Sequence, residues 1–370
     1  MSSHPIFSLQ AQGQLRPLAQ HAALHALLDD LPAYGLARAQ INTHLPMAMG
    51  ALAAIDASGD ALAAWAAARR RATPAAEALS ALPDMPDWRN AIGQQSAFPG
   101  LREYFLAQMR AHGVRNILLE VLHGMPFCPS GAAFHGLIRL AHGLDAQHLD
   151  ECAAGLAWLV CAAWTPAATD EAPSGALFDD PASALAWLEA EIGALPCDPS
   201  SITRSLHAAG ARPGLLARLP RLRSLQSDDE AVLAATLAAI AQCAIRAWLH
   251  AGGLTRLHLV TGGSALRRLL CHLPAAERKA LLPAMLQAFW QAVCLAWLVA
   301  EPAQAMPQAQ ALAPADWPDI LRAAARLQDV HDLKLAHACY AEAQAYGWPE
   351  YAQALAVLLQ AMRIKTDAGG

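Results

Sequence analysis

Hydrophobic and polar positions recur at the spacing of an α-helix from one end of the chain to the other. Apolar residues return every three or four positions, and the alternation of apolar and polar residues that marks a strand is nearly absent. Residues that commonly cap helices precede several of these runs: Asp60, Ser130, Asp180 and the acidic stretch 227–230. The pattern therefore predicts an all-α protein, a compact bundle of ten or more helices.

The helical pattern shows no fixed-period repeat, and no shift in composition marks a domain boundary. Prolines and glycines interrupt the pattern at residues 209–226. We therefore expect a single helical domain over residues 1–370, in which a break near 209–226 could separate two lobes.

One apolar stretch, residues 280–300 (ALLPAMLQAFWQAVCLAWLVA), contains no charged residue and is long enough to cross a bilayer. Alanine contributes little to membrane insertion, and Gln287 and Gln291 lie within the stretch. We interpret it as a central helix covered on all sides by other helices, and we expect no membrane partner.

The composition narrows the class of protein further. Hydrophobic residues make up 55% of the chain and charged residues 15%, with a net charge of -5, so the basic surface that nucleic acids require is not expected. The eight cysteines form no C-x-x-C pair, and the N-terminal segment lacks the pattern of a secretory signal. We expect a cytoplasmic protein with reduced thiols and no nucleic-acid partner. No pattern predicts its oligomeric state.

Histidine is the most unusual feature of the chain, with 15 copies against five tyrosines and seven phenylalanines. Several histidines lie in apolar surroundings. His44 lies in NTHLPMAMGAL, and His258 lies in GGLTRLHLVTGG between two glycine pairs, where backbones can approach closely. Taken singly, each could be a core histidine whose ring is satisfied by hydrogen bonds.

Two further segments place several polar groups on one face of a helix. FHGLIRLAHGL carries His135, Arg139 and His142 at the spacing i, i+4, i+7, and DVHDLKLAH carries His331 and Lys334 at i, i+3. The ordinary role of such a lysine is a solvated surface charge. Its neighbours His331 and Leu335, however, are typical of a helix face that is buried away from water.

Other chemistries have weaker sequence support. The motifs of nucleotide-binding loops, of a hydrolase nucleophile elbow and of zinc fingers are missing. The segment GGSALRR at 262–268 places glycines and arginines near a predicted helix start, where an anion could bind. Its glycines could equally serve to let helices pack.

The four histidine segments, taken in order, resemble the questin-oxidase-like family over about residues 35–345. Members are helical oxygenases that open anthraquinone-type rings of aromatic polyketides, by ring cleavage or by a Baeyer–Villiger-like oxidation. The resemblance implies a small-molecule aromatic substrate and dioxygen as co-substrate. NADPH is compatible with the family as a reductant, although the chain has no dinucleotide-binding motif.

The resemblance also implies a non-heme Fe(II) centre at the middle of the bundle, with the lysine carboxylated by carbon dioxide. The residues at the matching positions are His44, His135, His258, His331 and Lys334. Arg139 and His142 could orient a ligand or meet a substrate oxyanion, or each could be an ordinary salt-bridge partner. Asp329 or Asp332 could accept the second ring proton of a ligand histidine.

The implied site is chemically consistent. Neutral imidazoles and an anionic oxygen suit Fe(II), and burial disfavours a lysine ammonium, so the neutral amine can take up carbon dioxide. Two alternatives stay open on the same residues. One is a metal-dependent hydrolase, because histidines and a carboxylated lysine can hold zinc or paired metals. The other is a non-catalytic helical scaffold.

Overall fold

The computed structural model describes residues 5–8, 17–31, 41–55, 57–71, 87–164, 173–306 and 317–368. Within these ranges the chain forms fifteen helices of seven or more residues, which confirms the all-α prediction. The strands among the described residues are β1 (Leu177–Phe178) and β2 (Arg221–Leu222), which pair in parallel with Leu177 opposite Arg221.

The helices of the N-terminal half are α1 (Ala22–Asp29), α2 (Ile41–Ala54), α3 (Gly59–Arg71), α4 (Phe98–His112), α5 (Val114–Gly124), α6 (His135–Ala146) and α7 (Leu149–Cys161). Those of the C-terminal half are α8 (Pro181–Glu191), α9 (Ile202–Gly210), α10 (Leu215–Arg218), α11 (Glu230–Ala251), α12 (Leu254–His272), α13 (Ala275–Leu298), α14 (Trp317–Ala324), α15 (Val330–Tyr346) and α16 (Pro349–Ala368). Short 3-10 turns are η1 (Pro5–Phe7), η3 (Leu18–Gln20), η5 (Trp88–Ala91), η6 (Gln95–Ala97), η7 (Gly131–Phe134) and η8 (Arg223–Gln226).

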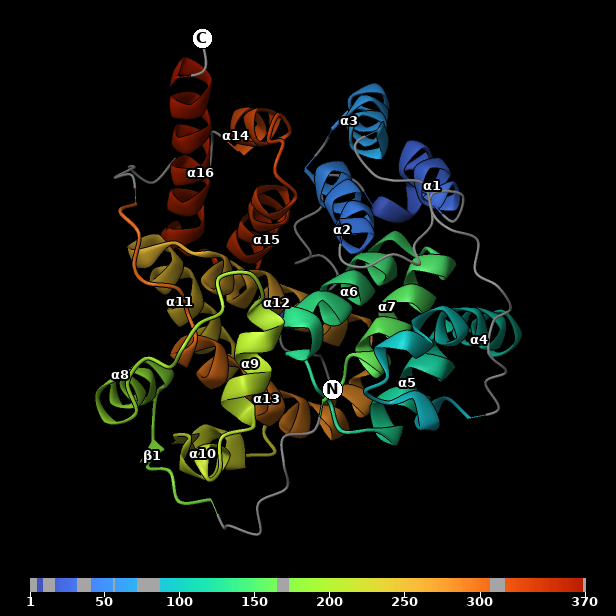
Figure 1. The fold of residues 1–370 in the computed structure, drawn as a ribbon. Coiled ribbons are helices and arrows are strands. Elements are labelled where there is room, and N and C mark those ends of the chain that lie inside the picture. The colour runs from blue at the N-terminus through green and yellow to red at the C-terminus, as the bar shows by residue number, and fades with distance from the viewer. Residues whose placement is uncertain are drawn as a thin grey trace.

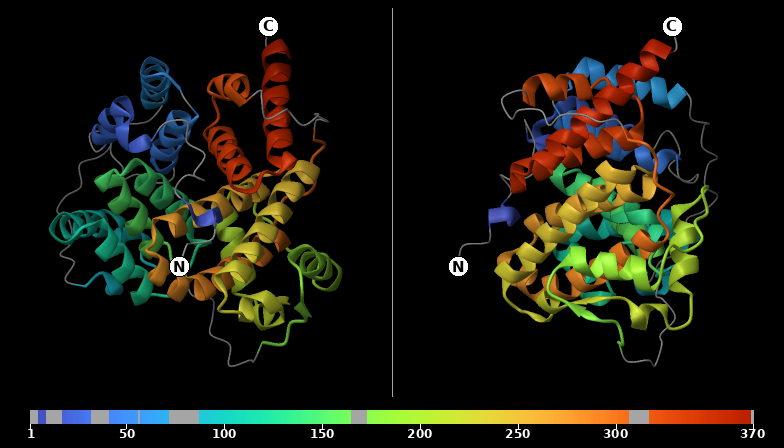
Figure 2. Two further views of the ribbon diagram at one scale, coloured as in Figure 1. Left: turned by 180° about the vertical axis from the view of Figure 1, so that it is seen from behind. Right: turned by 90° about the vertical axis from the view of Figure 1, so that its left-hand side faces the viewer.

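Helix α12 runs through the middle of the molecule and packs against α6, α11, α13 and α15 (Figure 1). Two groups of helices, α1–α3 and α14–α16, stand side by side above α12 in the view of Figure 1. Helix α13 lies on the other side of α12 (Figures 1 and 2). Helix α15 packs against both α2 and α12, and α2 packs against α6. Four helices distant in sequence, α2, α6, α12 and α15, therefore meet at the centre.

Side chains in the loops fix where several helices begin. Asp180 accepts a hydrogen bond from the Ser183 amide at the start of α8, and Asp229 accepts one from the Ala231 amide at the start of α11. The start at Asp180 was predicted, whereas α11 begins at Glu230, two residues after the start of the predicted acidic first turn. The start predicted after Ser130 is wrong, because α6 begins only at His135 and a short turn of unusual backbone geometry precedes it.

The long apolar helices lie in the interior. Helices α11 and α13 are long and apolar enough to cross a bilayer by length and composition, but half and two-thirds of their most apolar windows are buried inside the protein. Burial of this kind is what a core helix requires. The Trp290 indole of α13 also donates a hydrogen bond to the carbonyl oxygen of Pro220, at 2.7 Å.

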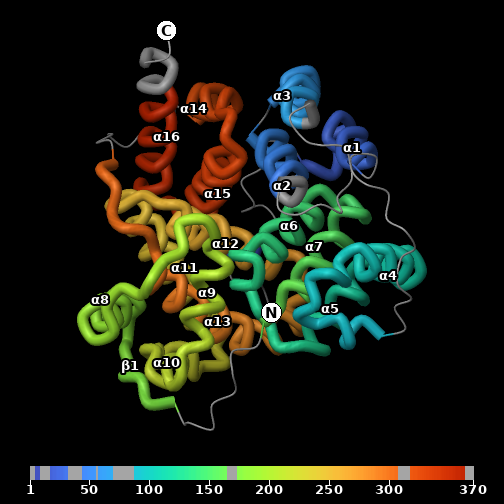
Figure 3. The backbone as a smooth tube through the Cα atoms, viewed as in Figure 1, coloured from blue at the N-terminus to red at the C-terminus, as the bar shows by residue number. Residues whose placement is uncertain are grey.

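The stretch 209–226 is not a bare linker. It contains the end of α9, then α10, β2 and η8, and both α9 and η8 pack on α13. In the tube drawing of Figure 3 these segments lie against α13 and α11.

Candidate metal centre

Each of the four central helices contributes one histidine from its first turns. His44 lies in α2, His135 is the first residue of α6, His258 lies in α12, and His331 is the second residue of α15. We call these four residues the histidine cluster. His258 is buried, and the other three are half-buried.

The ring nitrogens converge on one small space. The Nε2 atoms of His135 and His44 are 2.8 Å apart, and those of His258 and His135 are 3.4 Å apart. Ligand atoms of His44, His135 and His331 all lie within 4.8 Å of one another, and the rings of His258 and His331 have centroids 5.3 Å apart. Neighbouring nitrogens bound to one ion at about 2.1 Å are separated by about 3 Å, so the spacing fits a shared metal.

Hydrogen bonds determine which ring nitrogens face this space. His135 Nδ1 lies 2.5 Å from the Ala132 carbonyl oxygen, and His258 Nδ1 lies 2.8 Å from that of Leu254. A carbonyl oxygen only accepts, so each Nδ1 carries the proton and each Nε2 presents a lone pair. Two lone pairs 3.4 Å apart repel each other unless a cation lies between them. Histidine ligands of metals are held by their second nitrogen in this way.

The ring of His331 lies beside a carboxylate. Its Nδ1 lies 3.5 Å from the Asp329 carboxylate, and Asp329 also caps α15 by accepting from the amides of His331 and Asp332. The hydrogen bonds with His331 are the main reason why the pKa of Asp329 is lowered. Of the two carboxylates predicted to orient a histidine, Asp329 therefore contacts His331.

An unusual turn places His135. Ala132, Ala133 and Phe134 have φ angles of 48°, 52° and 67°, a left-handed turn that L-residues rarely adopt. Phe134 packs against Gly262 of α12, where a Cβ would lie 2.9 Å from the phenyl ring. The turn aims the Ala132 carbonyl at His135 and fixes α6 against α12.

Lys334 follows His331 by one helical turn and is 1% exposed. Burial lowers its pKa to about 7. Among the described residues no atom hydrogen-bonds to its Nζ. Its positive charge also adds to the burial that lowers the pKa of His135 and His258 well below the ordinary value. Lys334 therefore lies beside the histidine cluster and favours a neutral amine.

Arg139 lies elsewhere. Its guanidinium donates two hydrogen bonds to the Glu151 carboxylate of α7, at 2.7 and 2.8 Å, and both side chains are buried. Of the two roles predicted for Arg139, the geometry matches a salt-bridge partner that joins α6 to α7.

His142 belongs to a second polar group that sequence reasoning did not assemble. Its ring lies 5.2 Å from that of His337, and His337 Nδ1 lies 3.3 Å from the Arg268 guanidinium. We call His142, Arg268 and His337 the inner polar cluster; all three are buried. His337 had no predicted role, and the sequence signal for it was its position two turns after His331.

The segment GGSALRR lies inside α12, eight residues past its start at Leu254, so the helix start predicted there is wrong. Gly262 does serve helix packing. Arg268 and Arg267 point into the protein, where Arg267 pairs with Glu342 at 2.9 Å and Arg268 pairs with Asp145 at 2.9 Å.

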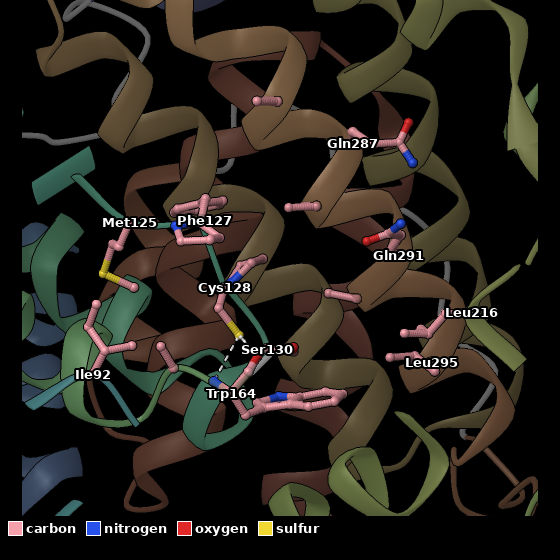
Figure 4. Close-up of a pocket in the computed structure, with 16 residues that line it drawn as sticks. Ile92, Met125, Phe127, Cys128, Ser130, Trp164, Leu216, Gln287, Gln291 and Leu295 are labelled. Atoms are coloured by element: carbon pink, nitrogen blue, oxygen red, sulfur yellow. Dashed lines mark hydrogen bonds between the residues drawn. The ribbon is translucent and has the colours of Figure 1, made fainter. Parts of the chain in front are cut away.

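A separate pocket of about 420 Å³ opens between α13 and the segment that leads into η7 (Figure 4). Phe127 and Trp164 form aromatic walls, and Gln287 and Gln291 point toward the cavity from α13. No member of either histidine-containing cluster is among its described lining residues. The pocket is therefore distinct from the candidate metal centre.

A comparison with curated proteins finds no match. The model of the questin oxidase-like family matches residues 41–339, which is more than half of the chain and includes the whole histidine cluster and Lys334. The chain belongs to the questin oxidase-like family, and this membership suggests an oxidoreductase.

Proposed function

We propose that this protein is a non-heme Fe(II)-dependent oxygenase that acts with dioxygen on an aromatic or polyketide-like ring. The observation that carries the proposal is the convergence of four imidazoles, two of which have Nδ1 held by a carbonyl oxygen so that Nε2 faces one space. Membership of the questin oxidase-like family supports the reaction class.

The orientation of the helices favours a metal ion that is bound together with an anionic ligand. Each central helix places its histidine within its first five residues, so four helix N-termini surround the cluster. Their dipoles favour negative charge and disfavour protonated imidazoles. An iron ion at this point needs an anionic ligand in addition to neutral histidines.

Lys334 can supply that anion. Its neutral amine would attack carbon dioxide, so that a C–N bond forms, one N–H bond breaks and a proton is released to solvent. The product is a carboxylated lysine with one negative charge. His44, His135, His258, His331 and the carboxylated Lys334 would then hold the iron, which supplies the site where dioxygen is activated.

The chain's own residues set the direction of approach. The His331 side chain is 21% exposed, whereas His258 and Lys334 are 1% exposed. Substrate and dioxygen would therefore enter on the His331 side, at the start of α15, while the inner side stays dry. We further propose a cytoplasmic location, a small-molecule aromatic substrate, no nucleic-acid or membrane partner, and NADPH as a reductant only where the substrate requires one.

Metal analysis combined with oxygen uptake tests the proposal. Protein purified without chelators should contain about one iron per chain and consume dioxygen in the presence of an aromatic polyketide. The variants H258A and H331A should lose the iron, because each removes a ligand. H123A is the matched control, because His123 lies at the surface and pairs with Glu277.

Three results would contradict the proposal. Full occupancy by zinc without oxygen uptake would favour the metal-dependent hydrolase. Destabilised H258A with the metal content of wild type would favour the non-catalytic scaffold. Iron retained in both H258A and H331A would show that the ion binds elsewhere.

A further inference from the structure

The inner polar cluster lies further along three of the four helices that carry the histidine cluster: α6, α12 and α15. On α6, His142 follows His135 by seven residues; on α15, His337 follows His331 by six. Seven residues correspond to about 10 Å along a helix. Lys334 lies between the two clusters on α15, and its charge contributes to the lowered pKa of His142, after burial and after Arg268 and His337.

Several atoms of the inner polar cluster are buried without a partner. Within the described part of the chain, His142 Nδ1, His337 Nε2 and Arg268 NH2 have no hydrogen-bond partner. Lys334 Nζ shares this condition. Buried polar groups in folded proteins are nearly always satisfied, because an unpaired one loses its hydrogen bonds with water and gains none in return. A concentration of orphans indicates a missing group.

The hydrogen bonds show that this group must accept. The guanidinium of Arg268 only donates, so His337 Nδ1 accepts from it, and the proton of the neutral His337 ring is on Nε2. Burial and then Arg268 lower the pKa of His337 to about 3, which keeps the ring neutral. His337 Nε2 and Arg268 NH2 are therefore both donors in need of an acceptor.

The carboxylate that lies beside Arg268 among the described residues is already engaged, so a further acceptor is needed. Asp145 is ion-paired with Arg268, with 2.9 Å between Oδ2 and Nε, and its Oδ1 lies 2.8 Å from His272 Nε2. Gly50 of α2 lets the His142 ring pack directly against its backbone, since a Cβ there would lie 2.9 Å from Nδ1. Lys334 and the donors of the inner polar cluster are thus buried together, and His337 follows Lys334 by one turn of α15.

We propose that the inner polar cluster holds the carboxylate group that carbon dioxide adds to Lys334. This inference rests on the proposed function, because it concerns the same lysine. His337 and Arg268 donate to one carboxylate oxygen and leave the other for the metal, and His142 supplies a further ring nitrogen. These three residues are positioning residues: they act through Lys334 and do not touch substrate.

Infrared difference spectroscopy on the full-length, iron-loaded protein tests the proposal without an activity assay. Samples equilibrated with ¹²C- or ¹³C-bicarbonate should differ by a carbamate band that the variant K334R lacks, because arginine cannot be carboxylated. The amplitude of this band against bicarbonate concentration gives the half-saturation point. The same titration applies to metal-free protein.

H337L and H142L should each raise the half-saturation concentration about tenfold or more, since H337L removes a hydrogen bond to a charged group and H142L removes the ring nitrogen beside it. H337Q should return it to within about threefold of wild type, because its amide restores a donor. H207L is the matched control: His207 also has a buried Nε2 without a partner among the described residues, but it lies against Trp164. Urea unfolding of each variant verifies that it is folded.

The proposal is overturned if H337L and H142L carboxylate at the bicarbonate concentration of wild type, or if H207L shifts as much as they do. Absence of the band in wild type also overturns it. Iron content and oxygen uptake, measured on the same samples, decide the proposed function separately. An iron-loaded, oxygen-consuming protein without the band would leave the oxygenase standing and remove this inference alone.

Discussion

At the scale of single residues, the site depends on which nitrogen of each ring carries a proton. The Ala132 and Leu254 carbonyl oxygens hold Nδ1 of His135 and His258 and direct Nε2 inward, and the Asp329 carboxylate lies 3.5 Å from Nδ1 of His331. Such partners are backbone atoms or capping residues, so spacing in the sequence could not reveal them. The sequence did place the histidines and Lys334 on apolar helix faces.

The amine of Lys334 should make stability depend on pH in the metal-free, bicarbonate-free protein. Its pKa in the folded protein is about 7, below the ordinary 10.5, so between these values the unfolded chain binds a proton that the folded protein does not. Stability should therefore rise with pH by about 1.4 kcal/mol per unit in this window, relative to the variant K334M. Urea unfolding at pH 7, 8 and 9 measures it. Parallel curves for the two proteins would mean that Lys334 is solvated.

At the scale of elements, the turn η7 is where prediction from sequence failed. Ser130 and Gly131 resemble a helix start, yet Ala132, Ala133 and Phe134 adopt a left-handed conformation that their side chains disfavour. The conformation is imposed by tertiary contacts, chiefly Phe134 against Gly262 of α12. Local strain of this kind is common at functional sites, where packing maintains it.

Substitutions at Ala133 should separate strain from metal binding. Glycine tolerates positive φ, so A133G should keep or raise stability by up to about 1 kcal/mol, while A133V should lower it by about 1–2 kcal/mol because β-branched residues suit this region least. A133G should also weaken iron binding, since a looser turn aims the Ala132 carbonyl less firmly at His135. Urea unfolding and metal titration provide both values. A large loss of stability in A133G would contradict the left-handed turn.

At the scale of the whole molecule, the helical class followed from periodicity and caps, since both are local. The meeting of α2, α6, α12 and α15 did not, because it depends on contacts between segments up to almost 300 residues apart. Only the family resemblance joined the four histidine segments before the structure did. Neither the helical pattern nor the family resemblance predicted the inner polar cluster, because Arg268 and His337 belong to no recognised motif.

The buried histidines should make the metal-free protein acid-sensitive. Burial, with neighbouring positive charges, lowers the pKa of His135, His142, His258 and His337, so below about pH 6.5 the unfolded chain binds protons that the folded protein excludes. Stability should fall from pH 7.5 to 5.5 by up to about 5 kcal/mol. The lowered carboxyl pKa values of Asp145 and Asp329 act only below about pH 4.

Urea unfolding at pH 7.5 and 5.5, with and without iron, measures this effect. Iron should hold the histidine rings deprotonated and make the loaded protein less sensitive to acid than the metal-free protein. Equal unfolding midpoints at the two pH values in metal-free protein would contradict the burial of neutral rings.

The most direct test of the central claim is a crystal structure of protein purified without chelators, with anomalous data collected at the iron absorption edge. We predict one anomalous peak about 2.0–2.3 Å from the Nε2 atoms of His44, His135, His258 and His331, with density that continues past Lys334 Nζ to the peak. A peak elsewhere, or side chains that point to separate surfaces, would contradict it.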